Sequence, residues 1–122
     1  MNLDDYLLAL DAKLHEISGI IIASSIQREM DSNIGMGLIK GTITFVDGSR
    51  FEFTEQLPTT RRKFRLHYMD AENNLIARWD SAPHHKQLAT FPFHKHNPQG
   101  IQANDAITVL GALDEIVNAL KI

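Results

Sequence analysis

The 122-residue sequence contains no cysteine and only four prolines and seven glycines. The lack of cysteine excludes disulfides, thiolate nucleophiles and cysteine metal ligands, and the low proline and glycine content excludes a low-complexity linker. No apolar run approaches the roughly 18–20 residues that span a bilayer. The first ten residues carry two acids and no base, which is unlike a signal peptide. We therefore expect a single soluble domain over residues 1–122, located in the cytoplasm without membrane contact.

Charge is unevenly distributed along the chain. The stretch from Arg61 to His96 holds seven basic and three acidic residues, a net +4, whereas the rest of the chain sums to −7. Five of the six histidines also lie in this basic stretch. A positive surface on an acidic body suits an anionic ligand such as phosphate or nucleic acid, although it could equally be a solvated face.

Apolar residues at helical spacing predict a helix at each end of the chain. The first runs from Leu3 to Ile17, with Asn2 as its cap and Gly19 as its stop. The second is expected to be capped by Asn104 or Asp105. Its expected apolar face consists of Ile107, Leu110, Leu113, Val117 and Leu120.

Between the helices the apolar period changes to two, which is typical of strands. Strands are expected over 19–29, 38–46 and 50–56, the last two joined by a three-residue loop with Gly48 in the left-handed conformation. The predicted fold class is α+β, with a mostly antiparallel sheet of four to six strands between the two helices.

A second hairpin, with arms 63–70 and 75–81, sorts polar from apolar residues. If position 70 faces 75, then His67 faces Arg78 and Arg65 faces Asp80 on one side of the sheet. The other side collects the apolar residues Phe64, Leu66, Tyr68, Ala77 and Trp79. Tyr68 and Trp79 are therefore expected in the core and not as stacking platforms for bases.

Four of the six histidines fall in the thirteen residues from His84 to His96. Pro83 and Pro92 interrupt this stretch and predict two short extended pieces. On a strand, His94 and His96 point the same way and Lys95 points to the opposite side. His15, on the first helix, is expected to have no functional role.

This histidine cluster permits two kinds of chemistry. Imidazoles can exchange protons near neutral pH, as cleavage of RNA by its own 2′-hydroxyl requires. In that interpretation His84, His85, His94 and His96 supply acid and base, with Asp80 as an orienting group. The cations and orienting side chains for the phosphate are Arg65, His67, Arg78, Lys86 and Lys95. Alternatively, the same histidines with Asp80 hold Zn²⁺, Mn²⁺ or Ni²⁺, which the surrounding lysines and arginines disfavour.

At these residues the sequence resembles the TumE-type toxins of toxin–antitoxin pairs. The resemblance rests on RLHYMD at 65–70, RWDSAPHHK at 78–86 and TFPFHKH at 90–96, and extends from about Phe64 to the C-terminus. It implies a growth-inhibiting protein held in check by an antitoxin, usually one with a helix-turn-helix. Ser81 and Phe93 depart from the pattern, because the family commonly has Asn and often His at these positions.

The sequence therefore predicts a toxin that cleaves RNA as a metal-independent endoribonuclease without a cofactor. Two alternatives stay open: a metal-dependent nuclease or phosphohydrolase, and a non-enzymatic module that binds nucleic acid or an antitoxin. The excess of histidine over what phosphate binding alone requires favours an enzyme. Expected partners are a helix-turn-helix antitoxin and RNA, and a homodimer through a sheet edge is possible.

Overall fold

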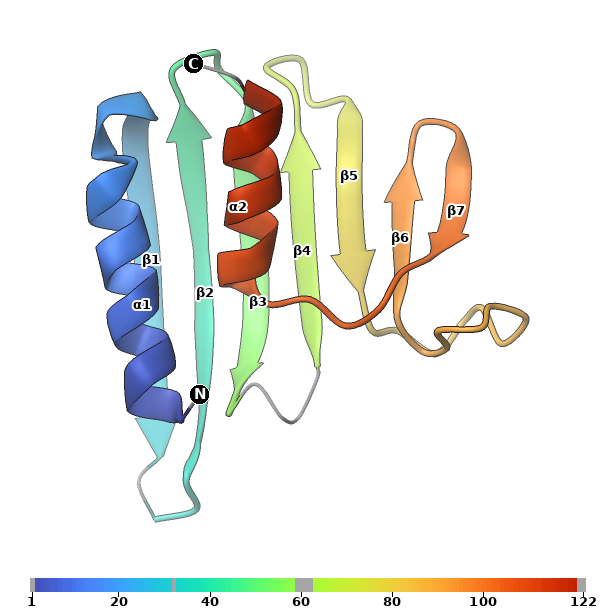
Figure 1. The fold of residues 1–122 in the computed structure, drawn as a ribbon, viewed down its shortest axis with the longest axis horizontal. Helices are drawn as coiled ribbons and strands as arrows, with labels where there is room; N and C mark the ends of the chain where they lie inside the picture. Colours follow the sequence, from blue (N-terminus) through green and yellow to red (C-terminus); the bar gives the residue numbers. More distant parts are fainter. Residues whose placement is uncertain (1, 32, 59–62, 121–122) are drawn as a thin grey trace.

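The computed structural model describes residues 2–31, 33–58 and 63–120, which form two α-helices and a seven-stranded sheet (Figure 1). Every neighbouring pair of strands is antiparallel, and the strands follow one another in chain order. The elements are α1 Leu3–Glu16, a 3₁₀ turn Ser18–Ile20, β1 Ile21–Asp31, β2 Met36–Phe45, β3 Arg50–Leu57, β4 Phe64–Met69, β5 Leu75–Asp80, β6 His94–Asn97, β7 Gly100–Ala103 and α2 Val109–Leu120.

The expected α+β class with a helix at each end is confirmed, but the expected count of four to six strands is wrong. The described residues hold seven strands because β6 and β7, of four residues each, form a short extra hairpin. Strands this short show little periodicity. The expectation of two extended pieces is also wrong, since residues 82–93 form turns and only the second piece is a strand.

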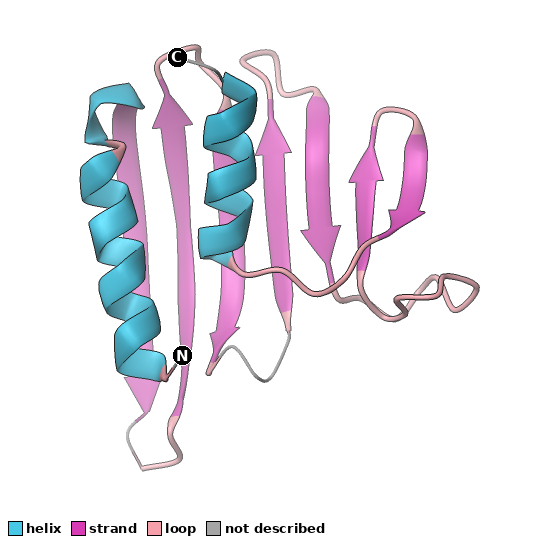
Figure 2. Ribbon diagram, in the orientation of Figure 1, coloured by secondary structure: helices cyan, strands magenta, loops and turns pink. Residues whose placement is uncertain are grey.

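Both helices lie on the same face of the sheet, and the described residues place no helix on the other face (Figures 1 and 2). Lys13 on α1 forms an ion pair of 2.8 Å with Asp114 on α2, and Arg28 on β1 pairs with Asp11 on α1. The core lies between helices and sheet. Its members without measurable exposure include Leu10, Ile39, Ile43, Phe45, Phe51, Leu57, Leu66, Val109, Ala112 and Leu113.

The start of α1 is confirmed, and the start of α2 is corrected. The Asn2 side chain accepts a hydrogen bond of 2.8 Å from the backbone N–H of Asp5, as an N-cap does. The second helix begins at Val109, not after Asn104 or Asp105. Thr108 takes the capping role, because its hydroxyl accepts a hydrogen bond of 3.1 Å from the Gly111 N–H. The most buried face of α2 is accordingly Val109, Ala112, Leu113 and Ile116.

Both expected hairpins form with the side-chain sorting that alternation predicts. Gly48 has φ +86°, and the Phe45 N–H donates to the Ser49 carbonyl at 2.9 Å, which closes a three-residue loop. In the second hairpin the expected pairs form on the side away from the helices. Only the pairing next to the turn differs, because a bulge lets Met69, and not residue 70, face Leu75.

A buried carboxylate joins the two helices to the sheet. Glu55 on β3 is 3% exposed. Its Oε1 accepts a hydrogen bond from the Tyr6 hydroxyl of α1, and its Oε2 accepts one of 3.3 Å from the Val109 N–H at the start of α2. Burial raises the pKa of Glu55 above its ordinary value. The same burial and the nearby Glu55 raise the pKa of Tyr6.

The raised pKa of Glu55 predicts the direction in which stability changes with pH. The folded state holds this proton more tightly than the unfolded state, where glutamate titrates at about 4.3. The resulting stabilisation is complete below that pH and is lost as pH rises through the folded-state pKa. We therefore expect the free energy of unfolding of the wild type, measured with urea, to fall relative to that of Glu55→Gln as pH rises.

The exposed Glu115 on α2 provides a matched control. Glu115→Gln is expected to follow the wild-type pH curve. Glu55→Ala should lose about 2 kcal/mol, because it leaves the Tyr6 hydroxyl and the Val109 N–H without their acceptor. Parallel curves for the wild type and Glu55→Gln would contradict this assignment.

Candidate functional site

Polar side chains cross the helix-free face of the sheet in two rows set by strand pairing. In the first row, neighbours opposite each other on β2 to β6 are Thr42, Glu52, His67, Arg78 and His96. In the second row they are Lys40, Thr54, Arg65, Asp80 and His94. Directly opposed residues of antiparallel strands share a face. The predicted pairs His67/Arg78 and Arg65/Asp80 therefore belong to a larger polar surface.

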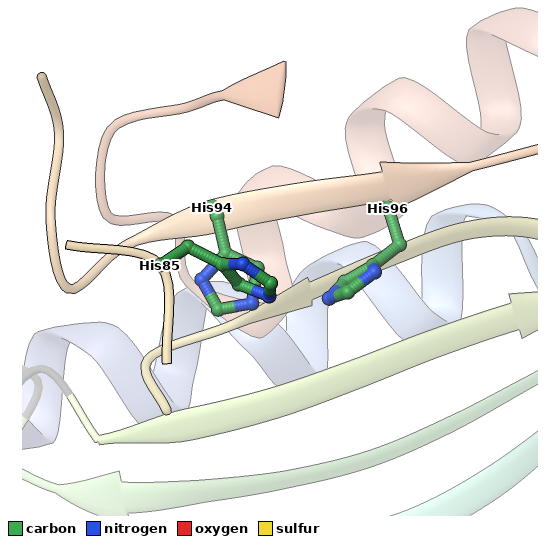
Figure 3. A group of neighbouring side chains, drawn as sticks. All are labelled: His85, His94 and His96. Carbon is green, nitrogen blue, oxygen red and sulfur yellow. The ribbon is translucent and has the colours of Figure 1, made fainter. Parts of the chain in front are cut away.

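The rows end in a histidine cluster on β6, formed by His85, His94 and His96. The rings of His94 and His96 project from the same side of the strand, and the loop before it brings His85 beside them (Figure 3). The ring centroids of His94 and His96 are 4.8 Å apart, and that of His85 lies 4.8 Å from His94 and 5.8 Å from His96. The three rings therefore lie side by side, although they come from two separate segments, the loop and β6.

Asp80 anchors this cluster from the neighbouring strand. Its side chain is largely buried, with Oδ1 2.9 Å from His94 Nε2 and Oδ2 3.8 Å from His96 Nε2. Oδ1 also accepts a hydrogen bond of 2.9 Å from the Ala82 N–H, at the start of the loop that carries His85. One carboxylate therefore positions both the strand and the loop of the cluster.

Both ring nitrogens of His94 face oxygen acceptors. Nε2 lies 2.9 Å from the Asp80 carboxylate, and Nδ1 lies 3.0 Å from the carbonyl oxygen of Pro92. A neutral imidazole can donate to only one of two acceptors, whereas an imidazolium can donate to both. His94 is also only 2% exposed. Its geometry is that of a buried donor that holds its neighbours, and it leaves no lone pair directed at a substrate.

His96 differs from His94 because its environment favours the neutral ring. Burial, followed by the positive charges of Arg78 and His94, lowers the pKa of His96 below its ordinary value, against the opposing effect of Asp80. Its side chain is 15% exposed, which leaves a path to a bound molecule. A neutral imidazole beside an arginine can accept a proton at neutral pH.

Two further side chains of the first row carry unused hydrogen-bonding capacity. Among the described residues, His67 Nδ1 and Arg78 Nε are buried without a hydrogen-bond partner, although Arg78 Nε lies 3.5 Å from Asp80 Oδ2 as a loose ion pair. Burial and the charges of Arg65 and Arg78 lower the pKa of His67. Buried polar atoms without a partner are uncommon in proteins; these two lie on the helix-free face, and the third one among the described residues belongs to Trp79 in the core.

Three residues expected in the site lie apart from this cluster. Lys95 points to the helix side, with Nζ 3.7 Å from Glu115 of α2 and 5.1 Å from the Trp79 ring. His84 and Lys86 are exposed in the loop on either side of His85. Of the basic stretch, Arg61 and Arg62 lie outside the described residues.

The two positions that depart from the TumE pattern make structural contacts near the cluster. The Ser81 hydroxyl accepts a hydrogen bond of 3.1 Å from the Phe64 N–H and so ties the end of β5 to the start of β4. Phe93 stacks on Phe64 with ring centroids 5.9 Å apart. Neither side chain is among the groups that could transfer a proton.

Lys40 and Glu52 of the two rows were not among the residues predicted to form the site. Both lie on strands whose outward positions follow directly from the alternation that located the core. The signal was therefore present in the apolar pattern of β2 and β3. It became visible only when the pairing across all the strands aligned these residues with the histidines.

The fold and the site define an α+β protein with a histidine-rich, arginine-lined face suited to an anion. Comparison with known families gives a match to the family described as Toxin TumE over residues 10–121. The chain therefore belongs to the TumE toxin family, which supports a toxin role and an antitoxin partner. No curated protein and no solved structure matches the chain. Neither helix of the described part has the length and apolarity needed to cross a membrane.

The contacts of Asp80 predict a large and local effect of its removal. Asp80→Ala leaves His94 Nε2 and the Ala82 N–H without their acceptor, and should lower the free energy of unfolding by about 2–3 kcal/mol. Hydrogen exchange should quicken specifically over residues 82–97. Asp114→Ala, which removes an exposed carboxylate from α2, should cost at most about 1 kcal/mol. Equal effects of the two variants would refute the anchoring role.

The environment of His96 predicts how its titration responds to a lost charge. In nuclear magnetic resonance titrations, the pKa of His96 should lie below 6.5, its ordinary value, so that the ring is neutral at pH 7. Arg78→Gln should raise this pKa, because a nearby positive charge disfavours the imidazolium. Lys40→Gln, four strands away, should leave it unchanged because of screening. An unaltered midpoint in Arg78→Gln would show that the arginine does not act on this ring.

Proposed function

We propose that this toxin is a metal-independent endoribonuclease in which His85 and His96 transfer the protons. The proposal rests on one observation: imidazole rings from the loop and from β6 lie together beside Arg78, on the face of the sheet without helices. RNA carries its own nucleophile, the 2′-hydroxyl, so a protein needs to supply only a base, an acid and positive charge. We assign these parts to His96, His85 and Arg78.

In the proposed reaction, neutral His96 removes the proton from the 2′-hydroxyl. The 2′-oxygen then forms a bond to the adjacent phosphorus, and the bond from phosphorus to the 5′-oxygen breaks. His85, in its protonated form, gives a proton to that departing oxygen. The products are a 2′,3′-cyclic phosphate and a 5′-hydroxyl, so atoms and charge balance without water or a metal.

The remaining site residues hold and position the substrate. Arg78 and Arg65 face the negative charge that develops on the phosphate, and His67 lies opposite Arg78 on the same face of the sheet. Asp80 and His94 are positioning residues, since their contacts are with other side chains and the backbone. His84 and Lys86 flank His85 on the exposed loop, where they can contact RNA beyond the cleaved bond.

Lys95 has no part in this proposal, because it lies on the helix side. The partner that blocks the toxin is proposed to be a helix-turn-helix antitoxin. An acidic segment of such a partner would satisfy the cations of the helix-free face and cover the cluster.

A metal-dependent nuclease is the second candidate, because one ligand atom from each of the three histidines lies within 4.8 Å of the others. Tetrahedral ligands at about 2.1 Å from Zn²⁺ are only roughly 3.4 Å apart, so the rings would have to move closer. His94 would also have to give up one of its two oxygen contacts. The acid–base interpretation requires neither change.

The proposal predicts the effects of histidine substitutions on cleavage. Purified, antitoxin-free protein should cleave RNA oligonucleotides, and the rate should rise with pH on the acidic side through the lowered pKa of His96. His96→Ala and His85→Ala should each reduce the rate by about 100-fold or more. His15→Ala, on an exposed surface of α1, serves as the matched control and should cleave as the wild type does.

Chelation separates the two candidate mechanisms. Excess EDTA should leave the rate unchanged. Loss of cleavage in EDTA and recovery with added Zn²⁺ or Mn²⁺ would replace the acid–base mechanism by the metal-dependent one. RNA binding without cleavage in either condition would contradict both and leave a binding module.

A further inference from the structure

A shallow polar groove lies on the helix-free face next to the site. It has a volume of about 400 Å³ and is lined by Gln27, Lys40, Thr42, Glu52, Thr54 and Arg65, among others. Arg65 belongs both to this groove and to the second polar row, opposite Asp80. The groove is therefore continuous with the histidine site and leads from it toward β1.

Glu52 is an unexpected residue in this groove. It is exposed, and among the described residues it has no ion-pair partner, although its charge acts on His67 opposite it. A carboxylate on a surface that receives phosphates repels them. Its presence in the groove, between Thr42 and His67 and one row away from Lys40 and Arg65, therefore calls for a ligand group that donates hydrogen bonds and carries no negative charge.

The spacing of the sheet places Glu52 within reach of a base. Glu52 and Arg78 are opposite the same residue of β4, so two strand spacings, about 10 Å, separate their backbones. This is comparable to the distance from a phosphate to the far edge of the base in one nucleotide. A nucleotide whose phosphate lies on Arg78 can thus present its base to Glu52.

The hydrogen-bonding edges of the four bases differ in what they offer a carboxylate. Guanine presents two adjacent donors, N1–H and N2–H, which can engage both carboxylate oxygens at once. Cytosine and adenine offer one amine beside a ring-nitrogen acceptor, and uracil offers one N–H between two carbonyls. Proteins read single-stranded RNA through these same edges.

We infer that Glu52 selects guanine in the RNA strand that the site cleaves. This inference rests on the proposed function and identifies its substrate preference. Two threonines line the groove beside the base. Thr42 lies opposite Glu52 on β2, and Thr54 lies two residues beyond Glu52 on β3. Lys40 and Arg65 contact phosphates on the two sides of it. Recognition is by hydrogen bonds, which makes it sensitive to single donor groups on the base.

Binding of non-cleavable RNA tests this inference separately from catalysis. The probes are short 2′-O-methyl oligonucleotides with one central G, A, C or U in an otherwise constant sequence, measured by fluorescence anisotropy at fixed salt. The wild type should bind the G probe about tenfold more tightly than the others. Inosine, which lacks the N2 amine, should lose part of this preference.

Glu52→Gln should abolish the preference, because an amide offers one acceptor in place of two. Glu72→Gln removes the same charge from the exposed β4–β5 turn, and this variant should retain the preference for guanine. Thermal unfolding of both variants establishes that they are folded. The same series in cleavable RNA then reports the base at the cut.

The outcomes separate this inference from the proposed function. Cleavage without base preference, or with a preference that Glu52→Gln retains, overturns the inference and leaves the nuclease. Guanine-selective binding that depends on Glu52, in a protein that does not cleave, supports the inference and overturns the nuclease. Selectivity lost equally in Glu72→Gln overturns the inference, since general charge would then explain it.

Discussion

The site depends on one constraint: both helices cover the same face of a continuous antiparallel sheet (Figure 2). Alternation along each strand then sends apolar side chains to the helices and polar ones to the open face. Because the pairing from β3 to β6 has no register shift across these positions, a residue on β3 stands in line with one on β6. Residues far apart in sequence thereby form two straight polar rows.

Burial and nearby positive charge together lower the pKa of two histidines on this face, His67 and His96. Burial lowers the pKa of both rings, and nearby positive charges lower it further: Arg65 and Arg78 at His67, Arg78 and His94 at His96. Asp80 opposes this lowering at His96. Its carboxylate contacts His94 and accepts a hydrogen bond from the loop at Ala82. Two histidines with different environments therefore occur two residues apart on one strand: His96 has a lowered pKa, and His94 is held between two oxygen atoms.

Much of this arrangement follows from the sequence, and the remainder has identifiable physical causes. The pairs His67/Arg78 and Arg65/Asp80 followed from alternation once the turn between their strands was located. Which of His84 and His85 joins the cluster did not, because residues 82–93 form turns without a period. The start of α2 was misplaced because Thr108 and the distant Glu55 set it through hydrogen bonds. Contacts between residues distant in sequence leave no local pattern.

In the proposed reaction, RNA is cut by its own 2′-hydroxyl with proton transfer by His85 and His96. The most direct measurement is the chemistry of the product ends, determined by mass spectrometry of a defined oligonucleotide after incubation with purified, antitoxin-free protein. This reaction should leave a 2′,3′-cyclic phosphate on one fragment and a 5′-hydroxyl on the other. Fragments with a 3′-hydroxyl and a 5′-phosphate would contradict this reaction, because they form when water attacks the phosphorus and the bond to the 3′-oxygen breaks.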